Sequence, residues 1–314
     1  MTPDLTAKLA GRRVVASVSG GKDSAALSLW LTEQGIEHDR VFLDTKWESP
    51  VTYEYLRGPL TAKLGPITEI SGPLPMEDLV EKRAMFPSRQ RRFCTEELKV
   101  FPMKRHLSAM MDAGTEPVNA LGIRAAESVA RSKMTEWEWS ATYDCEVWRP
   151  LISWTQEEVI AIHRRHDLRP NPLYLAGATR VGCYPCIMAN KGEIKLIADS
   201  SPDRIVRLAA LEERVAVAAK ARWERDRDAW EADPPSEPWS EEQQKKYQRL
   251  FVKDWQRPAW FQAPLGREKT WPIAKVVEWS RTSRGGKQFE MFAADPADAG
   301  CMRWGLCDTN GEEG

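Results

Sequence analysis

A run of small and polar residues, SVSGGKDS, stands near the start of the chain between an apolar stretch and an amphipathic one. Glycine tolerates positive φ and lets a backbone approach an anion, while the first turn of a helix presents unpaired N–H groups and a positive dipole end. The run therefore predicts a phosphate-binding loop. We expect Lys22 to neutralise a leaving pyrophosphate and Asp23 to hold Mg²⁺ or to orient the loop. The residues of this predicted site are Ser17, Ser19, Gly20, Gly21, Lys22, Asp23 and Ser24.

The loop is neither of two common glycine-rich phosphate motifs. A Walker A motif would need glycine where Ala16 stands and serine or threonine where Asp23 stands, and the G-x-G-x-x-G spacing is also missing. The alternative interpretation is a Gly/Ser-rich turn with an incidental lysine. Its position between a strand pattern and a helix pattern favours the phosphate-binding loop.

The cysteines form a second candidate site. The sequence VGCYPCIM places Cys183 and Cys186 at the C-x-x-C spacing, from which two thiolates of one turn can bind one metal or cluster. A redox dithiol is less favoured because the pair lacks a strand-to-helix setting. A structural zinc site could use this pair with Cys301 and Cys307, which would leave Cys94 as a catalytic thiol. Cys145 is interpreted as a core thiol. The histidines lack metal spacing, and His163 and His166 are expected on a helix surface.

Short β-branched runs alternate with helical patterns in the first third of the chain, which predicts a parallel sheet covered by helices. The expected strands are 13–17, 40–44, 66–71 and 118–122. The expected helices are 23–34, 51–64, one from Met76, one from Thr95, 155–166 with a capping box at Thr155 and Glu158, and 203–230. The fold class is therefore α/β and Rossmann-like, with helices on both faces of the sheet and a mainly helical, Cys- and Trp-containing C-terminal part.

A change of character near residue 170 predicts two domains. We expect a nucleotide-binding domain over residues 1–170 and a cysteine-containing, Trp-rich region over 171–314 that packs on it. This second region holds eight of the fourteen tryptophans. Its segment WPIAKVVEWSRTSRGGKQF could stack on nucleic acid, but core packing is favoured because acidic residues dilute its charge. RQRRF, with Arg91 and Arg92, is the better candidate for an anion-facing strip.

Composition limits the function classes. The 314 residues are 42% hydrophobic, and 45 Lys and Arg balance 46 Asp and Glu to a net charge of −1, so no global field points to nucleic acid or to an anionic membrane. No apolar segment is long enough for a membrane helix, and the start resembles no signal peptide. We expect a cytoplasmic protein with reduced thiols and no membrane partner. A homodimer stays an open alternative.

The string SGGKDS resembles the PP-loop signature SGGxDS of the adenine-nucleotide α-hydrolase superfamily, which contains ATP pyrophosphatases that adenylylate a substrate. The segment FLDT lies where enzymes of this superfamily place residues near the adenosine, and RRFCTEELKVFP and GIRAAESVAR resemble segments of its phosphoadenosine phosphosulfate (PAPS) reductase branch. The resemblance implies nucleotide contacts at Asp44, Thr45, Gly122 and Arg124. It also implies substrate contacts at Arg124, Glu127, Ser128, Arg131, Arg91 and Arg92. Arg124 and Arg131 follow a parallel strand, where open α/β sheets bind ligands.

The same resemblance bears on the cofactors. The DNA-phosphorothioation ATP pyrophosphatases also have one distant cysteine before a C-x-x-C pair, which implies a [4Fe–4S] cluster bound by Cys94, Cys183, Cys186 and either Cys301 or Cys307. In those enzymes the fourth cysteine follows the pair closely, and here none does. Structural Zn²⁺ is the alternative. The nucleotide cofactor expected at the loop is ATP with Mg²⁺.

Three functions remain open. The favoured one is an ATP pyrophosphatase that activates an acceptor, with iron–sulfur assistance to sulfur transfer; Lys22, Asp23 and Ser24 would be its catalytic residues. Its partners would be a nucleic-acid or small-molecule acceptor and a sulfur-donor protein. The second is a sulfonucleotide reductase that forms sulfite through Cys301 or Cys307. Against it, such reductases have a degenerate loop and an ECGIH-like tail, whereas this loop is intact and the chain ends in GCMRWGLCDTNGEEG. The third is a non-catalytic nucleotide and redox sensor.

Overall fold

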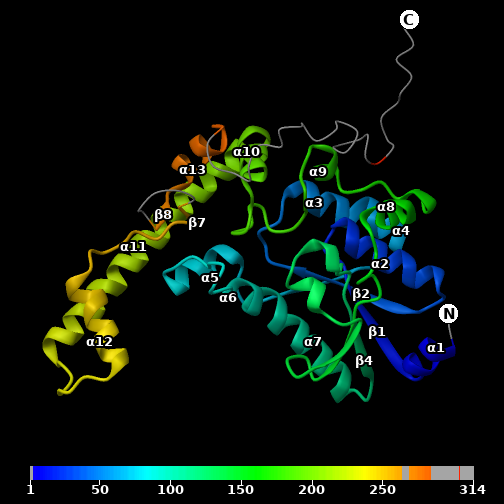
Figure 1. The fold of residues 1–314 in the computed structure, drawn as a ribbon, viewed down its shortest axis with the longest axis horizontal. Helices are drawn as coiled ribbons and strands as arrows, with labels where there is room; N and C mark the ends of the chain where they lie inside the picture. Colours follow the sequence, from blue (N-terminus) through cyan, green and yellow to red (C-terminus); the bar gives the residue numbers. More distant parts are fainter. Residues whose placement is uncertain (1–2, 264–268, 284–303, 305–314) are drawn as a thin grey trace, which may run out of the picture. The chain divides into compact units, whose positions relative to one another are not determined.

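The central sheet has six strands in the order β3-β2-β1-β4-β6-β5. A computed structural model describes residues 3–263, 269–283 and 304 (Figure 1). Every neighbouring pair is parallel except β5 with β6, which is antiparallel. The strands are β1 (Arg12–Ser17), β2 (His38–Asp44), β3 (Thr68–Ser71), β4 (Glu116–Ala120), β5 (Trp137–Ser140) and β6 (Cys145–Trp148). The α/β, Rossmann-like fold class predicted from the sequence is confirmed.

Helices cover both faces of this sheet because its strands are apolar on both sides. Along β1, Val14 and Ala16 belong to one buried cluster with Leu27 and Ile162, whereas Val15 belongs to a second cluster. Side chains alternate between the two faces of a strand, so the two clusters lie on opposite faces. The first face packs against α2 (Lys22–Glu33) and α8 (Gln156–Arg165), and the second against α7 (Phe101–Asp112). Figure 1 shows these helices around the strands.

The other helices of this part are shorter. The chain after β2 is helical from Pro50 to Leu64, with a π-helical turn at Leu56–Leu60, and it ends at Gly65, whose φ is +92°. Its pieces are α3 (Pro50–Tyr55), η1 (Leu56–Leu60) and α4 (Thr61–Leu64). The others are α1 (Pro3–Leu9), α6 (Phe93–Thr95), η2 (Glu96–Val100), η3 (Ala125–Glu127), η4 (Arg131–Lys133) and α9 (Pro172–Leu175).

The chain forms two compact units. The first unit contains Met1–Pro75, Thr95–Cys186 and, from the C-terminal segment, the described residue Trp304. The second unit contains Met76–Cys94 and Ile187–Gln288. The second unit therefore takes a short segment from between β3 and β4 of the first. The division at residue 170 into a nucleotide-binding domain and a C-terminal region stays a prediction.

The second unit is built around the 31-residue helix α11 (Pro202–Ala232). Helix α5 (Met76–Arg83) packs on it, with Glu77 paired to Arg207 and Arg214. The buried carboxylate of Glu212 accepts the backbone N–H groups of Trp260 and Ile273, each at 2.9 Å, while burial raises its pKa. The remaining elements are α10 (Lys191–Ser200), α12 (Glu241–Tyr247), η5 (Gln248–Val252), β7 (Phe261–Gln262), β8 (Thr270–Trp271) and α13 (Ile273–Ser280).

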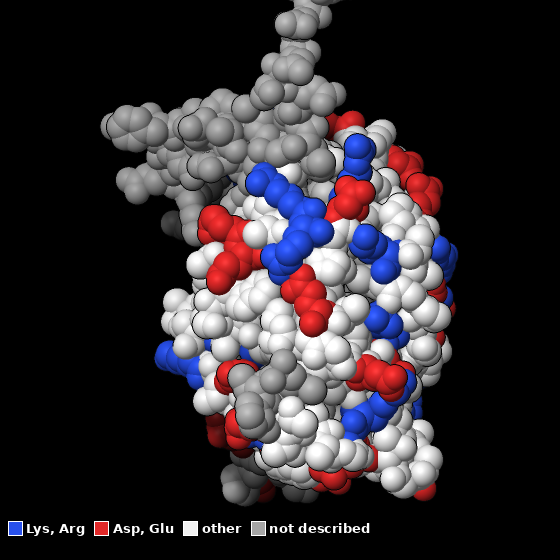
Figure 2. All heavy atoms as spheres, turned by 90° about the vertical axis from the view of Figure 1, so that its right-hand side faces the viewer, with Lys and Arg blue, Asp and Glu red and all other residues white. Residues whose placement is uncertain are grey.

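Charges of both signs are interspersed on the face drawn in Figure 2, which agrees with a net charge of −1. Among the described residues, no helix has the length and hydropathy needed to cross a membrane.

Candidate nucleotide-binding site

The turn from β1 to α2 lies where an open α/β sheet can bind a ligand. The strand order reverses at β1, because β2 follows on one side and β4 on the other. Ligands of such sheets bind at the carboxyl ends of the strands beside this switch point. Gly21 is the N-cap of α2 and makes no side-chain cap, so the first turn and its dipole face the loop. The Lys22 amide donates to the Tyr174 hydroxyl at 3.2 Å.

Gly20 is needed for this turn on two grounds. Its φ is +74°, a left-handed conformation that disfavours side chains. A Cβ at this position would also lie 3.0 Å from Thr52 Cγ2 and 3.2 Å from Leu56 Cγ. The close approach to α3 leaves room only for a glycine.

Ser24 holds the loop in shape from the first turn of α2. Its hydroxyl accepts the Ser19 amide at 3.0 Å, donates to the Gly21 carbonyl at 3.0 Å, and lies 3.2 Å from the Ser19 hydroxyl. Because one hydroxyl spans both ends of the loop, the amides between them are fixed before any ligand arrives. Ser17 ends β1 just before this network.

Three charged side chains form two ion pairs at the start of α2. Asp23 Oδ2 accepts Lys22 Nζ at 3.0 Å, and Asp23 Oδ1 accepts Arg124 Nε at 2.5 Å. The side chains of Lys22, Asp23 and Arg124 are 10%, 13% and 5% exposed. Both carboxylate oxygens therefore face cations. The two roles considered for Asp23, holding Mg²⁺ and orienting the loop, both stay predictions. Two nearly buried cations sharing one carboxylate form a site that could accept more negative charge.

Two polar residues from later in the chain contact the loop, Tyr174 and Asn171. The Lys22 ammonium lies 5.3 Å from the Tyr174 ring centroid. Asn171 donates through Nδ2 to the Gly20 carbonyl and the Thr52 hydroxyl, both at 3.3 Å. Sequence reasoning missed these residues, because a lone tyrosine or asparagine more than 140 residues away gives no local pattern. The only available signal was their position beside the C-x-x-C segment.

His163 is buried, so its expected place on the helix surface is wrong. It is 1% exposed, and Nε2 lies 2.8 Å from the Lys22 carbonyl while Nδ1 lies 3.3 Å from the Leu168 carbonyl. Burial lowers its pKa, which favours a neutral ring whose Nε2–H donates to Lys22. The side chain therefore ties α8 to the first residue of α2. His166 is paired with Glu33.

This histidine predicts a pH dependence of stability. Below about pH 6.5 the unfolded chain binds a proton that buried His163 excludes, so the free energy of unfolding falls with falling pH by up to about 1.4 kcal/mol per pH unit. His163→Gln keeps an N–H donor and removes this contribution. Urea unfolding between about pH 7.5 and pH 5.5 is expected to show a flatter dependence for the variant. Burial also lowers the pKa of His38, so in the variant His38 still contributes to the pH dependence of the free energy of unfolding. Identical slopes would contradict the role given to His163.

The carboxyl end of β2 brings together the next predicted residues. The Asp44 side chain is fully buried, and its Oδ1 accepts the Lys46 amide at 2.8 Å and the Tyr53 hydroxyl at 2.6 Å. Burial opposes ionisation of Asp44, but the hydrogen bonds from Lys46 and Tyr53 outweigh it, so the net pKa is lowered. An ionised carboxylate thus fixes the turn after β2.

Thr45 connects that turn to the C-x-x-C segment. Its hydroxyl donates to Glu48 Oε1 at 3.0 Å and lies 3.7 Å from Cys183 Sγ, which itself lies 3.9 Å from the same Glu48 oxygen. Burial, with the nearby Glu48 charge, raises the pKa of Cys183 to about 12. Without a bound metal, this pKa places Cys183 in the protonated thiol form at neutral pH.

The proposed metal ligands are only partly brought together. Cys183 and Cys186 share one short loop, Cys94 belongs to the second unit, and Cys301 and Cys307 lie outside the described residues. Within the described part of the chain, no group of three or more His, Cys, Asp or Glu side chains is arranged to hold a metal ion. Cys145 is 2% exposed in the core, as expected.

The loop after β4 closes on itself around Arg124. The Arg124 amide donates to Glu127 at 3.0 Å, Glu127 also pairs with Arg131, and the Arg131 amide donates to the Ser128 hydroxyl at 3.2 Å. These contacts shape the loop that aims the Arg124 guanidinium at Asp23. Arg91 and Arg92, in contrast, are exposed residues of the second unit.

Gly122 sets how closely this loop approaches α2. A Cβ there would lie 2.6 Å from the Asp23 carbonyl oxygen and 3.0 Å from Ser24 Cα, so the backbone of one element would have to move. Gly122→Ala is expected to lower the free energy of unfolding by about 1–3 kcal/mol, as overpacking does. Gly58→Ala, where a Cβ meets nothing within 4 Å, is the matched control and is expected to be neutral or stabilising. Equal unfolding midpoints for the two variants in urea would contradict this close approach.

The chain is similar to several known proteins. The family model of the phosphoadenosine phosphosulfate reductase domain matches residues 13–189, more than half of the chain. An uncharacterized 37.8 kDa protein of Escherichia phage 186 is 29% identical over 345 residues, covering 94% of this chain and 96% of that protein. An adenosine 5'-phosphosulfate reductase of Allochromatium vinosum is 36% identical over 103 residues, covering 33% of this chain and 37% of that enzyme. The PAPS reductase structure from Candida auris gives a TM-score of 0.44 at 18% identity, covering 59% of this chain and 89% of that chain.

Proposed function

The chain belongs to the phosphoadenosine phosphosulfate reductase domain family of PP-loop proteins, and from this premise we propose that it is an ATP pyrophosphatase. In the proposed reaction, it cleaves ATP between the α and β phosphates and adenylylates an acceptor. The observation that carries the proposal is the nearly buried arrangement of Lys22 and Arg124 around Asp23 at the start of α2. These cations exceed the charge of one carboxylate, and they lie beside a preformed loop of amides.

The proposed role of the site is electrostatic. An acceptor oxygen or nitrogen attacks the α phosphorus, the bond to the β-phosphate oxygen breaks, and pyrophosphate leaves with that electron pair while the acceptor proton passes to solvent. Negative charge grows on the leaving group. Lys22, the Ser19 hydroxyl and the amides of Gly20 and Gly21 would stabilise that charge, and Ser24, which accepts the Ser19 amide, would keep the loop in position. Mg²⁺ bound to the phosphates would share this charge.

The nucleoside is proposed to lie toward the carboxyl end of β2. Asp44 and Thr45 are held there by Lys46, Tyr53 and Glu48, so the turn is rigid. Gly122 and Arg124 would close the other side of the nucleotide from the end of β4. The assignment of Glu127, Ser128 and Arg131 to substrate binding remains part of this proposal.

Product analysis tests the proposal against sulfonucleotide reduction. The protein is incubated with Mg²⁺ and ATP labelled at the α phosphate, with single-stranded DNA, transfer RNA or a small alcohol or amine as acceptor. We expect AMP, free or bound to the acceptor, in amounts equal to pyrophosphate. ADP with inorganic phosphate would contradict the proposed bond cleavage. Sulfite released from adenosine 5'-phosphosulfate or PAPS with a thiol reductant and no ATP would favour a reductase instead.

We propose further that Cys183 and Cys186 are two ligands of a metal centre, with [4Fe–4S] as the favoured form and zinc as the alternative. Two thiols in one loop fit one half of a four-ligand site, and the described residues do not complete it. No step of the proposed ATP reaction depends on this metal centre. When bound, a cluster would supply sulfur or electron transfer chemistry to the activated acceptor.

Anaerobic purification with metal analysis tests this centre. We expect brown protein with about four irons per chain, lost on changing both Cys183 and Cys186 to serine and kept in Cys145→Ser. Colourless protein with about one zinc would favour the alternative. Absence of both metals from freshly purified protein would contradict the metal centre.

A further inference from the structure

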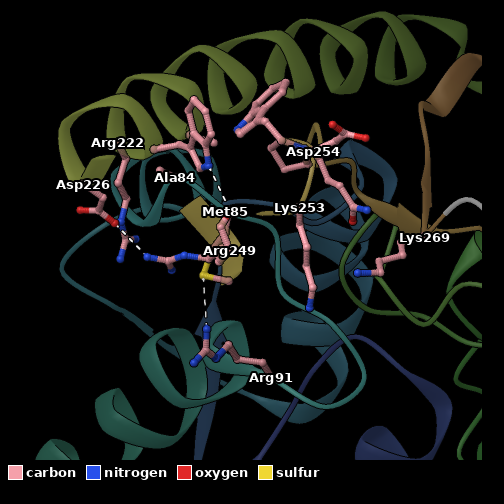
Figure 3. Close-up of a pocket in the computed structure, with 14 residues that line it drawn as sticks. Ala84, Met85, Arg91, Arg222, Asp226, Arg249, Lys253, Asp254 and Lys269 are labelled. Carbon is pink, nitrogen blue, oxygen red and sulfur yellow. Dashed lines mark hydrogen bonds and ion pairs between the residues drawn. The ribbon is translucent and has the colours of Figure 1, made fainter. Parts of the chain in front are cut away.

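The second unit contains a pocket of about 370 Å³ that is separate from the site described above. It lies between the segment after α5, the C-terminal half of α11 and the segment from η5 to β8 (Figure 3). We call it the Trp223 pocket. Its volume is within the range of small-ligand sites. The contacts that Glu212 makes to Trp260 and Ile273 anchor the third wall to α11.

The Trp223 pocket is strongly basic for a chain of near-zero net charge. Its cationic lining residues are Arg91, Arg222, Arg249, Lys253 and Lys269, and its carboxylates are Asp226 and Asp254. Asp226 is paired with Arg249 at 3.0 Å. Both lysines are exposed, and Figure 3 shows their side chains reaching toward the same open space. Cations therefore outnumber carboxylates by five to two, which favours an anionic ligand.

Two tryptophans give the Trp223 pocket aromatic surface beside these cations. Trp223 and Trp255 both line it and are both partly exposed. The Lys220 ammonium lies 4.4 Å from the Trp223 ring centroid and 5.4 Å from the Trp255 ring centroid, so the two rings are neighbours. The Trp223 indole N–H donates to the Arg249 carbonyl at 3.4 Å, which fixes its ring. Basic groups with fixed, partly exposed indoles are the pattern on which unpaired bases stack.

From this geometry we propose that the Trp223 pocket binds single-stranded nucleic acid, with a base stacked on Trp223 or Trp255 and phosphates on the surrounding cations. Exposed arginines continue past the pocket lining, at Arg83, Arg89 and Arg92. This favours a polymer with repeated phosphates over a single nucleotide. A concave site lined by indoles favours unstacked bases over a duplex, whose bases are already stacked. The role of this ligand as acceptor rests on the proposed function, whereas its binding does not.

Fluorescence anisotropy with the full chain, without ATP, tests the proposal. The probe is a fluorescein-labelled single-stranded DNA of about 12 nucleotides, within the site size of such proteins. Trp223→Ala is expected to weaken binding by about tenfold, while Trp223→Phe keeps an aromatic ring and most of the affinity. Trp139→Ala, an exposed tryptophan of β5 in the first unit, is the matched control and is expected to bind normally. Lys253→Gln is expected to reduce the slope of log affinity against log salt by about 0.7.

Several results would overturn the proposal. They are absence of binding, equal affinities of Trp223→Ala and Trp139→Ala, displacement of the probe by AMP, and tighter binding of the corresponding duplex. Equal binding of heparin would show a simple polyanion surface. Lys22→Ala is expected to bind the probe normally, so failure of the proposed ATP chemistry and failure of this pocket can be told apart.

Discussion

Replacing Lys22 with alanine is expected to slow pyrophosphate release from ATP by about 10²- to 10³-fold, the loss typical when one preorganised donor to developing charge is removed. Its side chain is 10% exposed, and its ammonium is paired with Asp23 at 3.0 Å and lies over the Tyr174 ring. A charge held in a site with so little solvent interacts more strongly with a developing charge than the same charge would in water. The measurement is the initial rate of pyrophosphate formation at saturating ATP.

Lys63→Ala is the matched control, because Lys63 is an exposed lysine on a helix of the same unit. It is expected to keep the wild-type rate. Thermal unfolding of both variants checks the fold, since Asp23 retains Arg124 as a partner when Lys22 is removed. A folded Lys22→Ala protein that releases pyrophosphate at the wild-type rate would refute the assignment of the loop.

Asp23→Ala is expected to lower the free energy of unfolding by about 3 kcal/mol, because it leaves two nearly buried cations without their shared carboxylate. Lys22 and Arg124 contact its two oxygens at 3.0 Å and 2.5 Å. The account also predicts a rescue. Pyrophosphate at about 100 times its dissociation constant would restore about 2.7 kcal/mol, since its oxygens would take the place of the carboxylate.

The ion pair of Asp39 with Arg13 provides the comparison. It has similar hydrogen-bond geometry, at 2.6 and 2.9 Å, but its side chains are 38% and 41% exposed. Asp39→Ala is therefore expected to destabilise the protein by about 1 kcal/mol or less, and pyrophosphate is expected to stabilise this variant no more than it stabilises the unaltered protein. Urea unfolding of the two variants with and without pyrophosphate makes the measurement. Equal losses, or no effect of pyrophosphate on Asp23→Ala, would show that this cluster is an ordinary structural ion pair.

Local signals predicted much of the fold because they depend on neighbouring residues. The glycines after β1 and the capping box of α8 at Thr155 and Glu158 both occur in the structure where the pattern put them. Strands β5 and β6 were not anticipated. Neither contains a run of β-branched residues like the one that indicated β3, and β6 joins the sheet through its partner β4.

The contacts that complete the site could not be predicted, since they join distant parts of the chain. Arg124 lies 101 residues from Asp23, and His163 lies 141 residues from Lys22. The sequence predicted His163 on a helix surface, because its neighbours in the helix are charged. In the structure, packing against Trp304 and α2 buries its side chain. Residues 76–94 and 187–288 likewise form one compact unit through packing. No change of composition along the sequence marks where these segments begin and end.

Hydrogen–deuterium exchange with an ATP analogue that carries a methylene group between the α and β phosphates tests the central claim most directly, because it reads the loop amides themselves. We predict that the analogue slows exchange in peptides covering residues 17–25 and 122–128 and leaves residues 203–232 unchanged. Lys22→Ala should show weaker protection at the same analogue concentration. Unchanged exchange in 17–25 at a concentration that saturates binding would contradict the claim that these amides hold the polyphosphate.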